Sequence, residues 1–196
     1  FEGDGYSENW IAEAKKRGLT NIRSVPDALK ELTSDKTIRL FQQNNVFTPR
    51  ELVARYEIKL DTFIKQLQIE SRVLGDLAIN HVVPTAIQYQ NILIENVKGL
   101  KEILDEKEYK ELSQPHIDSI KKISGHVKSI REMVSRMVDA RKEANETTDI
   151  VDMAHIYDKE IQVWFDEIRY HIDKLELICD DNMWPLPKYR ELLFIR

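Results

Sequence analysis

The sequence predicts an all-α protein with short N-terminal helices, an elongated antiparallel bundle of long, heptad-like helices, and an extended C-terminal tail. Apolar residues recur at steps of three, four or seven over long stretches, as they do along one face of an α-helix. The 196 residues include 6 Gly and 6 Pro, which are too few turn residues for a protein of many short strands. Charged residues make up 32% of the chain and hydrophobic residues 42%, a mixture typical of amphipathic helices.

Three short helices are predicted near the N-terminus. Ser7 can cap the first helix, and Gly18 can end it in the left-handed backbone conformation. Ser24 can cap the second helix, with Pro26 in its first turn, where a missing N–H leaves no bond unmade. The third helix is expected at about residues 35–44.

A long helix is predicted to start at Thr48. This residue can act as the cap, Pro49 occupies the first helical position, and Glu51 can complete a capping box. Pro84 crowds the preceding helical turn, so a kink or break is expected just before it. The apolar stripe before that point comprises Leu52, Tyr56, Leu60, Phe63, Leu67, Leu74, Leu77 and His81.

Two further helices complete the predicted bundle. One is expected to begin near Ser113 or Gln114 and the other near Thr148 or Asp149, with Ile130 and Ile161 in the middle of their apolar stripes. The connections between these segments are short, which favours antiparallel neighbours in an up-and-down bundle.

The C-terminal segment differs from the rest in being apolar and rich in proline. Pro185 and Pro187 push the residues before them toward extended geometry, so the stretch cannot continue the preceding helix. An apolar end is expected to dock on another surface, either the N-terminal short helices or an absent domain. The predicted division is 1–48, 49–182 and 183–196, and the predicted docking and structural residues are Trp184, Tyr189, Phe194 and Trp164.

The sequence contains no complete catalytic, cofactor-binding or metal-binding set. No two of the five histidines stand three or four residues apart, and Asp152 and His155 form only half of a carboxylate–histidine metal motif. The glycines at positions 3 and 5 lack the Lys-Ser/Thr of a phosphate-binding loop. Cys179 is followed by two acidic residues, which disfavour a thiolate, so we expect a buried structural thiol.

Composition also limits the partners. The net charge of -5 argues against nucleic acid, and no apolar run approaches the roughly 20 residues of a membrane span. A single cysteine favours a reducing compartment, and we expect the cytoplasm. The chain opens with neither an initiator Met nor a signal-peptide pattern, so it is expected to be a piece of a longer protein.

Several segments resemble glutamine synthetases. The stretch Ser24–Leu32, followed by Val46-Phe47-Thr48, is similar to the end of the catalytic domain in that family. Similarity to the long type III branch is carried by Phe1–Ser7, Glu13–Leu19 and Trp184–Tyr189.

This resemblance implies a bacterial parent enzyme of nitrogen metabolism that makes glutamine from glutamate, ammonia and ATP with Mg or Mn, as a double-ring homo-oligomer. It also implies that the catalytic residues lie upstream of Phe1, so that this region is a structural and oligomer-contact part, inactive alone. Tyr6 lies roughly where type I enzymes have a regulatory tyrosine, but the surrounding motif is absent. A stand-alone helical-bundle interaction or dimerisation module remains the alternative, although such a module has no need of the capped N-terminal helices.

Overall fold

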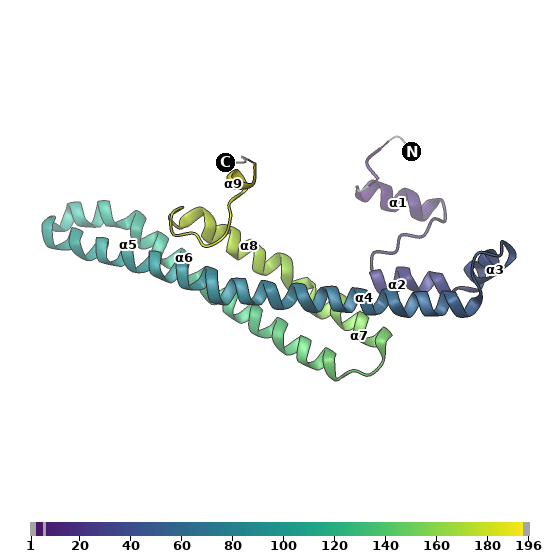
Figure 1. Cartoon of the computed structure of the whole chain (residues 1–196). Coiled ribbons are helices and arrows are strands. Elements are labelled where there is room, and N and C mark those ends of the chain that lie inside the picture. The colour runs from purple at the N-terminus through teal and green to yellow at the C-terminus, as the bar shows by residue number, and fades with distance from the viewer. Residues whose placement is uncertain (1–2, 6, 194–196) are drawn as a thin grey trace.

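The computed structural model describes residues 3–5 and 7–193, and its described residues form helices and no strand. The all-α prediction is confirmed. Figure 1 shows an elongated molecule in which three long helical rods run side by side, with shorter helices at the N-terminal end. None of the helices in the described part of the chain is long and apolar enough to cross a membrane.

The short N-terminal helices form where the caps predicted them. The Ser7 side chain accepts a hydrogen bond from the backbone of Trp10, and Ser24 accepts one from that of Asp27. Gly18 has a φ of +70°, the left-handed conformation that ends the first helix. The elements are α1 (Glu8–Lys16), α2 (Val25–Lys30), the 3-10 helix η1 (Glu31–Thr33) and α3 (Asp35–Gln43).

The first rod comprises α4 (Pro49–Asp76), η2 (Leu77–Val82) and α5 (Val83–Ile103). Its start is confirmed: Thr48 and Glu51 form the capping box, and these bonds lower the pKa of the Glu51 carboxyl. Of the kink or break predicted before Pro84, the break is wrong, because the rod continues through η2, a π-helical turn that lies just before the proline. Its wider bonding, with the Val83 N–H donating to the Ala78 carbonyl, accommodates the proline ring.

The second rod is α6 (Glu106–Glu146), which begins about eight residues earlier than predicted. Asp105 caps it by accepting hydrogen bonds from the backbone N–H groups of Lys107 and Glu108. Pro115 therefore lies inside the helix and not at its start. It is exposed, as is Glu111, so water can solvate the Glu111 carbonyl that lacks an intrahelical donor.

The third rod comprises α7 (Ile150–Ile156), the π-helical η3 (Tyr157–Ile161) and α8 (Val163–Ile178). It starts at Asp149 as predicted, because that side chain accepts from the backbone of Val151 and Asp152. The C-terminal tail is extended only at first. It ends in the short helix α9 (Tyr189–Leu193), which the prediction of an extended tail did not include.

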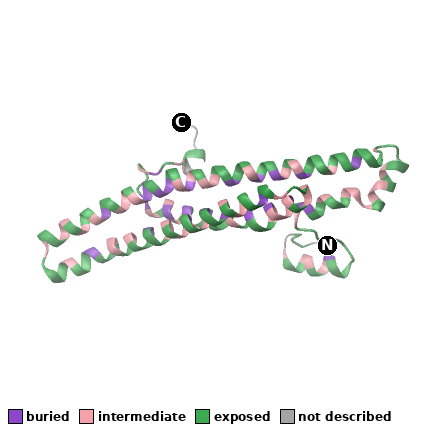
Figure 2. Cartoon of the chain, turned by 90° about the horizontal axis from the view of Figure 1, so that it is seen from below, coloured by how far each residue is buried: buried purple, intermediate pink, exposed green. Residues whose placement is uncertain are grey.

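The rods pack as an antiparallel bundle in which α6 contacts both α5 and α8, while α4 contacts α7. Figure 2 shows the buried residues concentrated on the facing sides of the rods. Ile130 and Ile161, predicted to lie mid-stripe, are completely buried. Other members of this core are Leu60, Ile64, Leu67, Val82, Ile123, Met137, Ile168 and Leu175.

A polar contact also joins the three rods. Tyr157 is completely buried, and its hydroxyl donates to the Asn145 side-chain oxygen over 2.9 Å. The same oxygen accepts from the Gln68 amide of the first rod over 3.1 Å. Because a buried hydroxyl without a partner is costly, this arrangement fixes the register of the rods.

Three of the N-terminal elements, α2, η1 and α3, pack on the bundle, whereas Figure 1 shows α1 standing apart from the rods. Helices α2, η1 and α3 pack against α4, and α2 also contacts α7. The division at residue 48 stays a prediction about the longer protein.

Candidate docking sites

The C-terminal segment turns back onto the bundle directly after α8. Cys179 is the C-cap of that helix. The Asp180 carbonyl accepts hydrogen bonds from the backbone N–H groups of Met183 and Trp184, each over 3.1 Å. The Asp180 carboxylate accepts from the Asn182 N–H over 2.7 Å. These bonds form a tight turn, which an aspartate favours because its side chain can satisfy nearby backbone donors.

The turn places the Trp184 ring in the core. Trp184 is 8% exposed and belongs to the same buried cluster as Leu175 and Cys179, with Leu186 packed against that cluster. The surface that receives the tryptophan is therefore the bundle itself. The two surfaces considered from the sequence, the N-terminal helices and an absent domain, do not supply it.

Lys188 fixes the far end of this turn, and sequence reasoning missed it. Its ammonium donates to the Glu176 carbonyl over 3.2 Å and contacts the Asp181 carboxylate. Its backbone N–H donates to the Glu191 carboxylate, which satisfies a donor at the start of α9. Nothing in the sequence around Lys188, which follows a proline, indicates that its side chain contacts α8, the helix that precedes the turn.

Cys179 is buried, as predicted, and burial raises the pKa of its thiol to about 11. Lys188 acts in the opposite direction and lowers it. The cause predicted from the sequence, the two following acids, is therefore not the one that dominates. A thiol held in its protonated form is a poor nucleophile.

The other predicted docking residues fall in different places. Trp164 on α8 is half-buried against the core, with the Arg136 guanidinium 5.8 Å from its ring centre. Tyr189 begins α9, and its side chain lies outside the described part of the chain. Phe194 and Tyr6 lie outside the described residues altogether.

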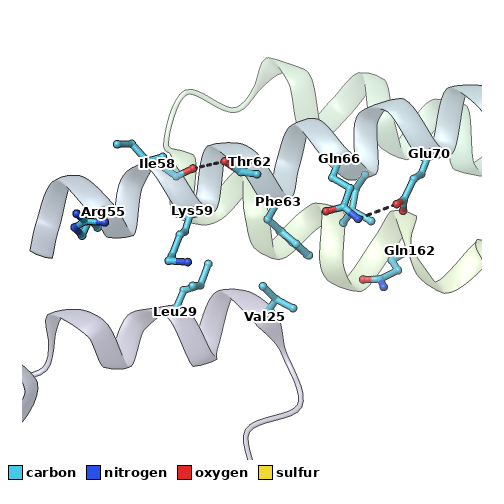
Figure 3. Close-up of a pocket in the computed structure, with 11 residues that line it drawn as sticks. Val25, Leu29, Arg55, Ile58, Lys59, Thr62, Phe63, Gln66, Glu70 and Gln162 are labelled. Carbon is cyan, nitrogen blue, oxygen red and sulfur yellow. Dashed lines mark hydrogen bonds between the residues drawn. The ribbon is translucent and has the colours of Figure 1, made fainter.

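A second candidate site is an open groove of about 700 Å³ between α2 and α4 (Figure 3). Val25 and Leu29 of α2 face Phe63 of α4 across it, and Leu67 also lines it, so its walls are largely apolar. Arg55, Lys59, Gln66, Glu70 and Gln162 line its edges. Apolar walls with a few polar groups at the edge are typical of binding sites in proteins.

The Asp152 and His155 motif does not gather a metal site. The His155 Nε2 lies 3.7 Å from the Asp27 carboxylate, so the ring makes an interhelical contact from α7 to α2. Its buried Nδ1 has no hydrogen-bond partner. In the part of the chain that the structure describes, no three His, Cys, Asp or Glu side chains are grouped as a metal site requires.

The structure also brings together two histidines that the sequence does not pair. His126 of α6 and His171 of α8 are both half-buried, and their Nδ1 atoms lie 2.8 Å apart. They are 45 positions apart in the chain, so no short-range motif could have indicated the contact.

The described residues thus define a class of protein, an elongated helical module with its own core. Residues 1–101 match the family described as the glutamine synthetase C-terminal domain. The chain belongs to that family, which confirms the resemblance seen in the sequence.

Three relatives bear on which branch it resembles. Over its whole length the chain is 47% identical to a glutamine synthetase of Bacteroides fragilis and 32% identical to a type-3 glutamine synthetase of Dictyostelium discoideum. Over 99% of its length it is 27% identical to a glutamine synthetase of Butyrivibrio fibrisolvens. In each case it spans 27% of the relative's length.

Proposed function

We propose that this chain is the helical C-terminal region of a bacterial, cytoplasmic type III glutamine synthetase, and that it supports contacts with the upstream catalytic domain and between subunits. The whole enzyme would condense glutamate with ammonia at the expense of ATP, using Mg²⁺ or Mn²⁺, in a double-ring homo-oligomer. The observation that carries the proposal is coverage: the full chain aligns with only 27% of the length of glutamine synthetases.

The distribution of apolar side chains supports the contact role. Ile58 and Ile69 of α4 are both 64% exposed, and Val73 lies one turn further along the same face. At the other end, Leu192 and Leu193 of α9 are 69% and 74% exposed. Exposed apolar residues gathered on one face favour association with another protein surface.

The division of activity is tested by comparing the isolated chain with the full-length protein. We expect glutamine formation and ATP hydrolysis from the full-length protein with Mg²⁺ or Mn²⁺, and neither from the isolated chain. Turnover by the isolated chain would overturn the assignment of chemistry to the upstream domain. A full-length protein without ligase activity, together with an isolated chain that dimerises tightly, would instead support a stand-alone dimerisation module.

The contact role is tested separately with the double substitution Ile58→Asp and Ile69→Asp. Both positions are exposed, so the isolated chain should keep its melting temperature. In the full-length protein the charges would face an apolar partner surface, and we expect smaller particles in analytical ultracentrifugation. Unchanged particle size and activity would remove α4 from the contact surface.

A further inference from the structure

The contact between His126 and His171 has the geometry of a hydrogen bond between two imidazole rings. The Nδ1 atoms are 2.8 Å apart and the ring centres 5.1 Å apart. The difference between these distances is about the width of one imidazole ring, which equals the two distances from a ring centre to its own Nδ1 added together. Both Nδ1 atoms therefore lie close to the line that joins the ring centres. The two lone-pair directions thus point at each other and do not converge on a shared metal position beside them.

A hydrogen bond of this kind depends on protonation. Neutral imidazole has one N–H donor and one acceptor nitrogen, so one ring must donate from Nδ1 while the other accepts at Nδ1. A single added proton preserves the bond, because a protonated ring still donates to a neutral one. A second proton places two N–H donors and two positive charges against each other, and the bond is lost.

The surroundings make the second proton harder to accept. Burial is the largest cause that lowers the pKa of His126, followed by the charges of His171 and Lys174. The His171 ring is also packed edge-on against Tyr170, 5.2 Å between ring centres. From α5, the neutral side-chain amide of Gln90 contacts α6 within the two turns before His126. It donates to the Ile120 carbonyl and to the Ser124 hydroxyl.

We propose that His126 and His171 form a proton-sensitive latch between α6 and α8, which holds the helices together while the pair carries at most one proton and releases them when both rings are protonated. His171 is on α8, and the C-terminal end of α8 leads directly into the turn that holds Trp184. Loosening α8 therefore loosens the seat of the C-terminal segment as well.

The sign of the pH dependence follows from proton counts. In the unfolded chain both rings accept a proton near their ordinary pKa of 6.5, whereas the folded pair resists the second. Below pH 6.5 the unfolded chain then binds more protons, so the stability of the folded chain is lost as the pH falls. For one proton the unfolding equilibrium constant rises at most tenfold per pH unit.

The test compares the whole chain with the double variant His126→Gln and His171→Gln, whose side chains do not titrate. Urea unfolding is measured from pH 7.5 to 5, and amide exchange in α8 is followed after correction for the intrinsic rate. Below pH 6.5 we expect the unfolding equilibrium constant of the natural chain to rise, relative to that of the double variant, by up to tenfold per pH unit. His116→Gln, on the same helix as His126, is the matched control and should keep the natural pH profile.

A second measurement requires no variant. In the natural chain, NMR titration should place the pKa of His126 below its ordinary value of 6.5, because the pair resists a second proton. Parallel stability profiles for the natural chain and the double variant would overturn the proposal. So would a His126 ring that titrates near 6.5 in the folded chain.

Discussion

Trp184 is the residue on which the position of the C-terminal segment depends. Its ring is 8% exposed, and the Asp180 turn aims it into the bundle core. Loss of a buried tryptophan typically costs about 3–5 kcal/mol, since both the burial and the packing are lost. We expect Trp184→Ala to lower the free energy of unfolding by that amount in urea titrations. Leu177→Ala, at a position 80% exposed on the neighbouring helix end, is the control and should change it little.

The buried stripes give a second prediction at this scale. Ile130 and Ile161 are each 0% exposed and lie on different rods. Ile130→Asp or Ile161→Asp should destabilise by several kcal/mol, because a carboxylate in the core has no partner. Val163→Asp, two positions beyond Ile161 and exposed, supplies the matched control. Unchanged thermal melts for both core variants would show that the stripes have been assigned to the wrong faces.

Cys179 gives a prediction about reactivity. With a thiol pKa of about 11, almost no thiolate exists at pH 8 in the folded chain, and the side chain is buried. A disulfide reagent should therefore react slowly with the folded chain at pH 8 and quickly in urea. Because the folded state retains the proton between the ordinary pKa and 11, stability should fall as the pH rises through that window. Rapid labelling of the folded chain would contradict the burial.

Which residues were predictable depended on how local their interactions are. Ser7, Ser24 and Thr48 bond within three positions, so their caps could be inferred from the sequence. The contacts of Lys188 and of the histidine pair cross between turns or helices, and no local pattern records them. The docking role of Tyr189 and Phe194 stays a prediction, because the Tyr189 side chain and all of Phe194 lie outside the described part of the chain.

At the scale of elements, the start of α6 shows how two sequence signals compete. The predicted start at Ser113 or Gln114 lies directly before Pro115, and proline is common in the first turn of a helix. Asp105 followed by Glu108 is an N-terminal signature as well, and the structure uses it. The proline is tolerated inside because the carbonyl it leaves without a donor faces water.

The cap at Asp105 can be tested directly. Asp105→Ala removes the acceptor of two backbone N–H groups, which typically costs about 1 kcal/mol. We expect faster amide exchange over residues 106–112, with the exchange of the core part of α6 little changed. Glu102→Ala, before the turn and exposed, should leave the exchange of this segment as it is. Equal protection in both variants would mean that the helix does not begin at Glu106.

At the scale of the whole molecule, the sequence predicted the helical rods better than the irregular turns within them and the packing of the tail on them. Periodicity identifies which face of a helix is apolar, and the antiparallel order follows from short connections. It does not show that η2 and η3 are π-helical, nor that the C-terminal tail packs back on the bundle, because neither feature has a repeating apolar pattern. The chain thus contains a part that stabilises itself and a second part, the exposed apolar residues of α4 and α9, for which we propose a partner outside the chain.

Staged truncation separates these two parts. Removal of residues 183–196 deletes Trp184 and Lys188, so the isolated chain should melt at a lower temperature. Removal of residues 189–196 keeps both and deletes Leu192 and Leu193, which are exposed, so the isolated chain should melt nearly as before. In the full-length protein we expect the shorter truncation to weaken the assembly, measured by analytical ultracentrifugation, because it removes apolar side chains available to a partner. If the shorter truncation instead destabilises the isolated chain as much as the longer one, the segment has a single role within the bundle, and the contact role of α9 is wrong.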